Sequence, residues 1–404
     1  MYIVGIDIAK FSHQGIIISK ESGEVLCKSF KFHNSHEGLN LLLQKIREVS
    51  PAISDFEIGM EATGHYWLNL YTHLLDNGFT IHVINPLQSD ALRNLYLRKQ
   101  KTDSIDAKII AQVIRFGQYS ETKLKDGNIL AIRELCRQRF YLVDKGADLK
   151  RKIGVMMDKI FPEYKSIFSD MFGKSSIALL KKYTTPKEFL QAETFKIVQI
   201  IKRASGGKLG ERKAIEIKMT AKNSFYSLLD SENYSVMIKQ MVEQIELNEF
   251  HIFQLEKIIQ KTFEPFKSKI TQIPGIGEVL GASIFSEIGD INRFSSIKKL
   301  TAYAGIDPSV RQSGEFLGTE NHMSKRGSPY LRRALWIAAF VTVNHNESII
   351  SLYNRRKLIG KSHFQIMGFI CHKLLNIIYS ILKKNEDYKN QQCKNQQWTN
   401  LLSS

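Results

Sequence analysis

Four acidic residues separated by apolar stretches are the side chains in this sequence best suited to binding a metal ion. Asp103 and Asp106 stand three residues apart at the start of a segment in which isoleucine and valine recur at helical spacing from Ile105 to Val113. Residues three apart share one face of a helix, and two carboxylates so placed repel each other unless a cation lies between them. Hard divalent cations bind oxygen pairs of this kind. The structural alternative is that Asp103 caps the helix and Asp106 favours its dipole.

Two further acids are expected at the ends of strands. Asp7 lies within residues 1–10, an apolar segment that predicts a buried strand, where a carboxylate is costly unless it is paired or metal-bound. Glu61 ends the strand expected over residues 55–61. Carboxylates at adjacent strand ends, joined by a helical pair, can hold two metal ions about 4 Å apart and clamp a phosphate between them. The pattern predicts a site for Mg²⁺, with Mn²⁺ as a possible substitute, formed by Asp7, Glu61, Asp103 and Asp106.

The elements expected around these acids are three strands, followed by strands that alternate with helices. Strands are expected over residues 1–10, 13–18, 24–32, 55–61 and 79–84, and helices over residues 36–49 and 67–77, after Pro86, and from Asp103 onward. This order is typical of a mixed sheet with helices on its faces. With the acids in these places, the α/β pattern resembles an RNase H-like, RuvC-type nuclease domain. Actin-like ATPases share the opening Gly-Ile-Asp-Ile but need a glycine-rich hairpin directly afterwards, which is missing before Gly15.

Composition points to a partner that carries many negative charges. The length of 404 residues suggests two or three domains. The chain contains 57 Lys and Arg against 40 Asp and Glu, which gives a net charge of +17. Nucleic acid is the default partner for a chain this basic. No apolar run of about 18 residues and no signal peptide is recognisable, so no membrane partner is expected. The cysteines are far apart, which predicts a reducing, cytoplasmic compartment and no zinc site. They are Cys27, Cys136, Cys371 and Cys393.

Two long segments carry apolar residues at intervals of seven. They cover residues 129–164 and 236–263. Repeats of this length predict a coiled-coil stalk, within one chain or between chains, with an ordinary helix bundle as the alternative. The residues at these intervals are Leu135, Leu142, Leu149 and Met156, and Ile238, Ile245, Ile252 and Ile259.

These segments divide the chain into expected domains. The α/β domain should cover residues 1–126, the stalk 127–265 and a mainly α-helical domain 266–383. A basic insert of short helices is expected over residues 165–235, within the stalk. The polar tail over residues 384–404 is expected to be disordered.

Pro274-Gly275-Ile276-Gly277 has the signature of a helix-hairpin-helix motif. Its glycines let backbone N–H groups at a helix N-terminus approach a DNA phosphate. The alternative is a tight turn between packed helices.

A basic region surrounds the turn at Ser313-Gly314. A serine nucleophile needs an exposed oxygen and nearby positive charge to offset the charge of the phosphate it attacks. A plain turn is the alternative for Ser313. The basic residues proposed to contact phosphate around this turn are Arg311, Lys325, Arg326, Arg332 and Arg333, and those beside the helical acids are Arg98, Lys99 and Lys101. For the second group, a solvated basic face is equally compatible with the sequence.

Taken together, these motifs resemble those of the DEDD-type transposases of bacterial insertion sequences, the IS one-ten family, which are related to the Piv/MooV site-specific DNA invertases. The first block of similarity runs through residues 1–115 with Gly-Ile-Asp-Ile-Ala-Lys, Met-Glu-Ala-Thr-Gly and Lys-Thr-Asp-Ser-Ile-Asp-Ala. The second runs from Ile-Pro-Gly-Ile-Gly through Ala-Gly-Ile-Asp-Pro and Gln-Ser-Gly to Ser-Lys-Arg-Gly-Ser-Pro-Tyr-Leu-Arg-Arg-Ala-Leu.

The resemblance implies a DNA recombinase. Asp7, Glu61, Asp103 and Asp106 would form its metal-binding tetrad, and Ser313 would become joined covalently to DNA. It also implies double-stranded donor and target DNA as partners, a structured noncoding guide RNA, and a homo-oligomer, dimer or tetramer, in which one subunit's acids meet another's serine. The alternative is a RuvC-like nuclease or a DNA invertase that acts without a guide RNA.

Overall fold

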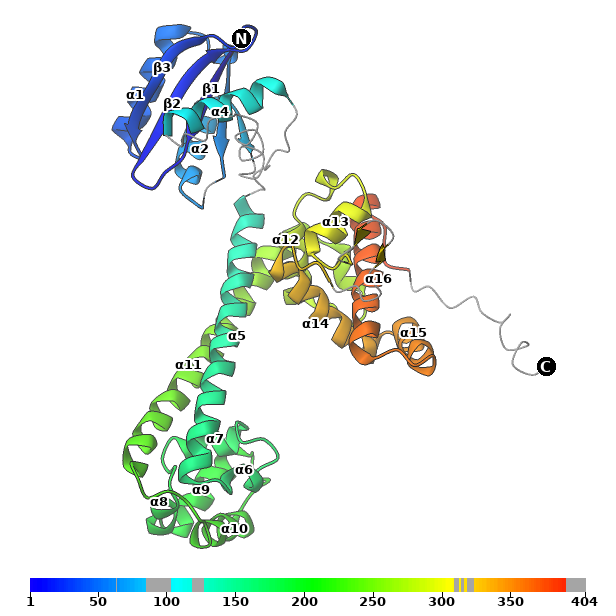
Figure 1. The fold of residues 1–404 in the computed structure, drawn as a ribbon. Coiled ribbons are helices and arrows are strands. Elements are labelled where there is room, and N and C mark those ends of the chain that lie inside the picture. The colour runs from blue at the N-terminus through cyan, green and yellow to red at the C-terminus, as the bar shows by residue number, and fades with distance from the viewer. Residues whose placement is uncertain are drawn as a thin grey trace, which may run out of the picture. The chain divides into compact units, whose positions relative to one another are not determined.

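The computed structural model describes residues 1–62, 64–84, 103–117, 127–308, 312–313, 316–317 and 323–389. The side chains of Asp103, Ser104 and residues 312–317 lie outside this description. The chain forms two compact units, Met1–Leu124 and Lys125–Ser404, which are coloured along the chain in Figure 1. The division falls within two residues of the first expected domain boundary.

The first unit contains a five-stranded mixed sheet. Its strand order is β3-β2-β1-β4-β5, in which β1, β2 and β3 are antiparallel and β4 and β5 run parallel to β1. The expected strands are therefore confirmed, and each begins and ends close to its expected limits. The strands are β1 (Tyr2–Asp7), β2 (Ser12–Ser19), β3 (Val25–His33), β4 (Phe56–Glu61) and β5 (Thr80–Ile84).

Helices cover both faces of this sheet. On one face, α1 (His36–Val49) and α2 (Trp67–Asp76) bury an apolar core with alternate strand residues, and a single 3₁₀ turn, η1 (Ile53–Asp55), leads into β4. On the other face lies α4 (Asp103–Phe116), which packs on isoleucines of β1, β2 and β5. Each strand contributes to both cores because successive side chains point to opposite faces. The helix expected after Pro86 lies outside the described residues.

Two long helices of the second unit pair within the same chain. They are α5 (Gly127–Ile160) and α11 (Ser231–Phe263). Ile153 lies in the same apolar cluster as Ile238, whereas Ile132, near the other end of α5, lies in the same cluster as Ile259. The two helices are therefore antiparallel, and the heptad positions of this chain meet each other. Arg139 and Glu256 add an ion pair of 2.7 Å between them.

Short helices occupy the insert between the stalk helices, as expected. They surround Tyr164 and Phe189, both fully buried, and this cluster continues into the stalk around Ile153. The insert thus shares an apolar core with the adjoining ends of α5 and α11, which its lysine-rich sequence does not suggest. Its helices are α6 (Tyr164–Ile167), α7 (Lys174–Leu180), α8 (Pro186–Gln191), α9 (Thr194–Ala204) and α10 (Glu211–Lys222).

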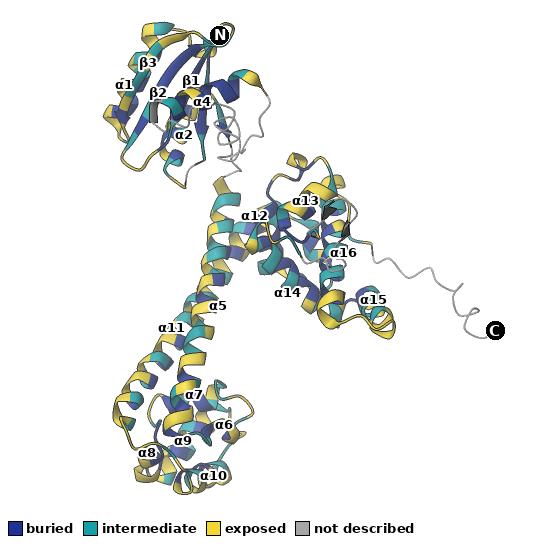
Figure 2. Ribbon diagram, in the orientation of Figure 1, coloured by how far each residue is buried: buried dark blue, intermediate teal, exposed yellow. Residues whose placement is uncertain are grey.

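The C-terminal region is mainly helical, as expected, and is built around one apolar core. A two-stranded hairpin, β6 and β7, lies between α13 and α14. Figure 2 shows buried residues concentrated where these helices meet and exposed residues along much of the stalk. The elements are η2 (Glu264–Phe266), η3 (Lys269–Gln272), α12 (Glu278–Ile288), η4 (Ile291–Arg293), α13 (Ile297–Ala304), β6 (Gln312–Ser313), β7 (Phe316–Leu317), α14 (Pro329–His345), α15 (Glu347–Leu358) and α16 (His363–Lys384).

Two expectations about the C-terminus need correction. Helix α16 is long and apolar enough to cross a membrane by length and composition, although no such run was expected from the sequence. Its buried residues, including Ile370, Leu374 and Ile378, pack in the C-terminal core, which accounts for their apolar character. The tail was expected to be disordered from residue 384, yet Asn385 accepts a hydrogen bond from Lys269, and Tyr388 donates its backbone N–H to Gln272. Residues 390–404 lie outside the described residues.

Candidate active site and nucleic-acid interface

Asp7 and Glu61 are the last residues of two neighbouring parallel strands. Ile6 of β1 pairs with Met60 of β4, so the acids that follow these residues lie side by side at the same edge of the sheet. Each acid stands two residues beyond a glycine, Gly5 or Gly59, that lies beneath α4. Because strand residues two apart point to the same face, both acids are on the α4 face.

Helix α4 runs antiparallel to β1, which brings its first turn toward this edge. Near its C-terminal end, Arg115 donates hydrogen bonds of 3.1 Å and 3.0 Å to the carbonyl oxygens of Lys20 and Glu21. Lys20 in turn donates its backbone N–H to Met1, at the start of β1. The first turn of α4, which contains Asp106, therefore lies toward the C-terminal ends of β1 and β4.

Asp106 is only 6% exposed and belongs to the side of α4 that packs against the sheet. Its neighbours Ala107, Ile109 and Ile110 are buried against the sheet. A carboxylate in such surroundings is costly unless polar contacts or a cation compensate its charge. Asp103 begins α4, but its side chain is outside the described residues.

The donor set fits a hard divalent cation, since its members carry only carboxylate oxygens. Among the described residues, no group of three or more His, Cys, Asp or Glu side chains is close enough to hold a metal ion. The fourth acid, Asp103, is not among the side chains to which that statement applies.

The structure accounts for Glu57, which shares the α4 face of β4 with Glu61. It forms an ion pair of 2.5 Å with Lys20, and His82 lies 3.7 Å from its other carboxylate oxygen. Glu57 thus holds the β2–β3 turn against β4. This engagement makes it a structural acid.

Ser313 lies in the small hairpin of the second unit, where its backbone pairs with Phe316 of β7. Of the local serines that could compete with it as nucleophile, Ser324 donates a hydrogen bond to Asp307, and Ser328 donates one of 2.9 Å to Glu287. Ser309 lies outside the described residues, as do four basic residues expected at the site, Arg98, Lys99, Lys101 and Arg311.

Two of the arginines expected to bind nucleic acid make contacts within the protein. Arg333 forms two hydrogen bonds of 2.7 Å with the carboxylate of Asp144 on α5 and lies over the ring of Phe140. Arg332 donates to the carbonyl oxygen of Ala304 at 3.3 Å. These contacts connect α14 to the stalk and to the end of α13.

Lys325 and Arg326 are exposed. Lys325 has a φ of 54°, and its backbone N–H donates to Gly305. Gly327 packs so closely on Tyr303 that an added Cβ atom would lie 2.0 Å from its carbonyl oxygen. The turn that presents these two basic side chains is therefore held firmly against the end of α13.

The two glycines of the expected helix-hairpin-helix motif have different surroundings. Gly275 has a φ of 97°, and a Cβ atom there would come within 3.0 Å of Thr342 on α14. Gly277 precedes α12 and has no neighbour within 4 Å of such an atom. The segment before the turn is the single 3₁₀ turn Lys269–Gln272, not a full α-helix. Only Gly277 is open to a ligand.

A buried acid that was not predicted from the sequence connects the stalk to the C-terminal helices. Glu287 is 2% exposed and accepts hydrogen bonds of 2.7 Å and 3.2 Å from Arg137 on α5. Burial lowers the pKa of Arg137, but its hydrogen bond and ion pair with Glu287 outweigh that effect and leave the pKa raised. A glutamate inside the apolar sequence of α12 was the available signal, of the same kind that drew attention to Asp7.

Two family models of transposases match parts of this chain. A family model for DEDD transposases of the IS110 type, described as a transposase, matches residues 4–162. A second, described as the transposase IS116/IS110/IS902 family, matches residues 267–354, so that the two together cover more than half of the chain.

Relatives match along nearly the whole chain. An uncharacterized 43.6 kDa protein of insertion element IS110 from Streptomyces coelicolor is 21% identical over 396 residues, which are 96% of this chain and 95% of that one. The pilin gene-inverting protein of Moraxella bovis is 23% identical over 389 residues, 95% of this chain and 97% of that one. The mini-circle putative transposase for IS117, also from Streptomyces coelicolor, is 21% identical over 402 residues, with 96% and 95% covered. The chain therefore belongs to the IS116/IS110/IS902 family of transposases, enzymes that cut and rejoin DNA.

Proposed function

We propose that this protein moves an insertion sequence by cutting and rejoining double-stranded DNA at a carboxylate–metal site that acts together with Ser313. The observation that carries the proposal is that Asp7 and Glu61 end neighbouring parallel strands on the face of the sheet that is covered by α4, the helix that carries Asp106. The mixed sheet, with an antiparallel first half and two parallel strands, supports our inference of an RNase H-like, RuvC-type fold for the first unit.

The metal site would consist of Asp7, Glu61, Asp103 and Asp106, and Mg²⁺ or Mn²⁺ suits their oxygen atoms. A bound ion of this kind stabilises charge that develops on a phosphate during displacement. The strand ends position two of the acids, and α4 carries the other two. The burial of Asp106 limits the directions that its carboxylate can take, which favours a preorganised site.

Ser313 would keep hold of the DNA between cutting and rejoining. Its oxygen would form a bond to phosphorus while the bond to one deoxyribose oxygen breaks, and the serine proton would pass to that leaving oxygen. The phosphoserine ester conserves the energy of the phosphodiester bond, and attack by a second DNA hydroxyl would release the serine. An alcohol needs a base or a metal ion to draw off its proton. Among the serines near it, Ser324 and Ser328 already donate to acids, which supports Ser313 over them.

The nucleic-acid surface is proposed to include the exposed Lys325 and Arg326 and the open N-terminus of α12 at Gly277. Arg332 and Arg333 would support this surface through their contacts within the protein. Arg98, Lys99, Lys101 and Arg311 are proposed as further contacts on the basis of sequence alone. A structured noncoding RNA as guide is proposed from the family resemblance and the net charge of +17.

A homo-oligomer formed along the stalk is also proposed. Leu247, Phe250 and Phe253 of α11 are 53–55% exposed midway along the helix, where the pairing with α5 leaves them uncovered. Apolar side chains grouped in this way commonly mark a protein interface. Such an assembly would allow the acids of one subunit to meet the serine of another.

The covalent intermediate is the most direct test. Wild-type protein and a Ser313→Ala variant would be incubated with labelled donor and target DNA, denatured and analysed by gel and mass spectrometry. We expect a serine–DNA adduct on Ser313 in the wild type and none in the variant, with Ser309→Ala as the matched control that keeps it. An adduct that survives Ser313→Ala would refute the assignment. Cleavage by the wild type without any adduct would favour a nuclease, and the similarity to the pilin gene-inverting protein makes inversion of a defined segment the second candidate outcome.

A further inference from the structure

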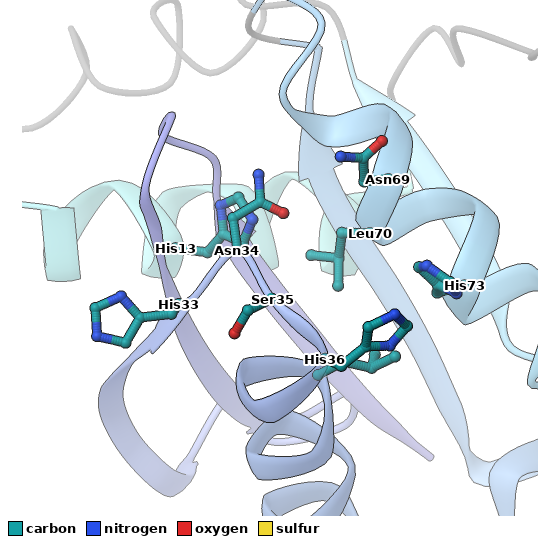
Figure 3. Close-up of a pocket in the computed structure, with 9 residues that line it drawn as sticks. His13, His33, Asn34, Ser35, His36, Asn69, Leu70 and His73 are labelled. Atoms are coloured by element: carbon teal, nitrogen blue, oxygen red, sulfur yellow. The ribbon is translucent and has the colours of Figure 1, made fainter.

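A pocket on the α1 and α2 face of the first unit has a lining rich in hydrogen-bond donors. Figure 3 shows it between the start of β2, the end of β3 and the two helices. Its volume is 210 Å³, ample for a phosphate group, since a water molecule in the liquid occupies about 30 Å³. None of its lining residues is acidic, and its polar residues include His13, Asn34, Ser35, His36, Asn69 and His73.

His13 is the most informative of these residues. It is 1% exposed, and burial lowers its pKa against a smaller opposing effect of Asn34, so the ring is neutral at pH 7. Its Nδ1 accepts a hydrogen bond of 3.3 Å from the backbone N–H of Ala9. The proton of the neutral ring must then be on Nε2, because one imidazole nitrogen donates when the other accepts.

That Nε2 donor is buried and has no hydrogen-bond partner within the described protein. Hydrogen bonding with the side chain of Asn34 raises the pKa of His13 by less than burial lowers it, and Asn34 makes no hydrogen bond of normal geometry with Nε2. Native proteins seldom leave a buried donor unsatisfied, because its lost hydration is then not compensated. His13 is therefore placed to donate a hydrogen bond to an acceptor that the described lining of the pocket does not supply.

The N-terminus of α1 points to the same requirement. Ser35 caps this 14-residue helix by accepting a hydrogen bond from Gly38, and both Ser35 and His36 line the pocket. The positive end of a helix dipole favours an anion. Across the pocket, α2 contributes Asn69 and His73, whose ring lies 5.1 Å from that of His36. Donors from three elements thus surround one space.

The pocket lies near the edge of the sheet that carries the acids. Ala9, which positions the ring of His13, follows Asp7 by two residues, and His13 is the second residue of β2. Asp7 faces α4, whereas the pocket opens on the opposite face, next to Leu39 and Leu70. A polymer that passes over this edge can place one phosphate at the acids and another in the pocket.

We propose that this pocket binds a backbone phosphate of the nucleic acid, with Nε2 of His13 and the start of α1 as donors to its oxygens. This assignment rests on the proposed function for the identity of the polymer. The pocket would position the strand and take no part in bond breaking.

The test uses the full-length protein and inorganic phosphate as the first probe. Phosphate replaces chloride at constant ionic strength, and thermal unfolding is recorded. A ligand that binds only the folded state raises the melting temperature. We expect a rise in the wild type and none in His13→Leu, which has similar volume, lacks the donor and suits the apolar contact with Phe32. Asn69→Ala, on the opposite wall, should weaken the response, while His251→Leu on the stalk should keep it.

Two further measurements decide the source of the phosphate. Binding of duplex DNA at fixed salt should weaken about tenfold in His13→Leu, as expected for one hydrogen bond to a charged group. A phosphate response that is equal in wild type and His13→Leu would overturn the proposal, as would unchanged DNA affinity, which would assign the pocket to free phosphate. The serine–DNA adduct is assayed separately, so failure of the recombination mechanism and failure of this pocket can be distinguished.

Discussion

Gly5 of β1 and Gly59 of β4 face each other in register beneath α4. A Cβ atom on Gly5 would lie 2.3 Å from the carbonyl oxygen of Ala107, and one on Gly59 would lie 2.5 Å from a side-chain carbon of Ile114. The two glycines therefore determine how closely the helix that carries Asp103 and Asp106 can approach the strands that carry Asp7 and Glu61.

Replacing Gly5 with alanine should change the positions of the four acids relative to one another without replacing any of them. Overpacking of a close contact costs about 1–3 kcal/mol, and here the obstacle is backbone, so α4 must shift. We expect lower stability in urea unfolding and a loss of adduct formation under conditions in which the variant stays folded. Gly146→Ala is the matched control, because it lies in α5 with nothing within 4 Å. A Gly5→Ala variant with full activity would show that the approach of α4 is not required.

Activity should depend on the acids and on a divalent ion. Asp7→Asn and Asp106→Asn remove one charged ligand each and should abolish recombination while they retain DNA binding. Mg²⁺ or Mn²⁺ should support the reaction, and Ca²⁺ should do so poorly because it takes looser coordination with more ligands. Recombination assays with chelator and defined ions would measure this, with Asp76→Asn, an exposed position on α2, as control. Full activity of either variant, or activity in EDTA, would contradict the metal assignment.

Lys325 and Arg326 should contribute more than Arg333 to the salt dependence of DNA binding. Each lost phosphate contact reduces the slope of log K against log salt by about 0.9, so Lys325→Ala with Arg326→Ala should flatten it by roughly one to two units. Arg333→Ala should leave the slope nearly unchanged and destabilise the protein by up to about 1 kcal/mol, because it breaks a partly exposed ion pair with Asp144. Binding titrations at several salt concentrations would separate the two, and a flatter slope for Arg333→Ala alone would show that this residue reaches DNA.

Self-association should depend on exposed residues of α11. Phe250→Asp with Phe253→Asp places charge on the uncovered face and should dissociate an oligomer while the chain stays folded. Ile245 is unsuitable for this purpose because it is 2% exposed and belongs to the core shared with the insert. Light scattering in the presence of DNA would measure the change, and Phe225→Asp, at another exposed apolar position, is the control. A wild-type protein that remains a monomer with DNA and RNA present would refute the stalk interface.

The order of elements could be predicted from the sequence because their signals are local. The continuous apolar run of β1, the alternation of apolar residues in β4, the helical spacing in α4 and the heptads of α5 and α11 depend on neighbours only a few residues away. Asp7, Glu61 and Asp106 were conspicuous for the same reason, since each lies within or directly beside a run of apolar residues. The tail was misjudged because its composition is polar, whereas Tyr388 is held by Gln272, more than a hundred residues earlier.

What the tertiary structure decided depends on contacts between distant parts of the chain. Nothing near Arg333 in sequence indicates that Asp144 will neutralise it, and nothing near His13 indicates that Ala9 will occupy one nitrogen and leave the other without an acceptor. The heptads were compatible with pairing within or between chains, and the antiparallel contact of Ile132 with the Ile259 region resolved it in favour of one chain. The sequence by itself determined which residues are chemically able to act. The folded structure decided which of them are already engaged, because a charge or a donor is neutralised by whatever group lies within a few ångströms of it, however far away that group is along the chain.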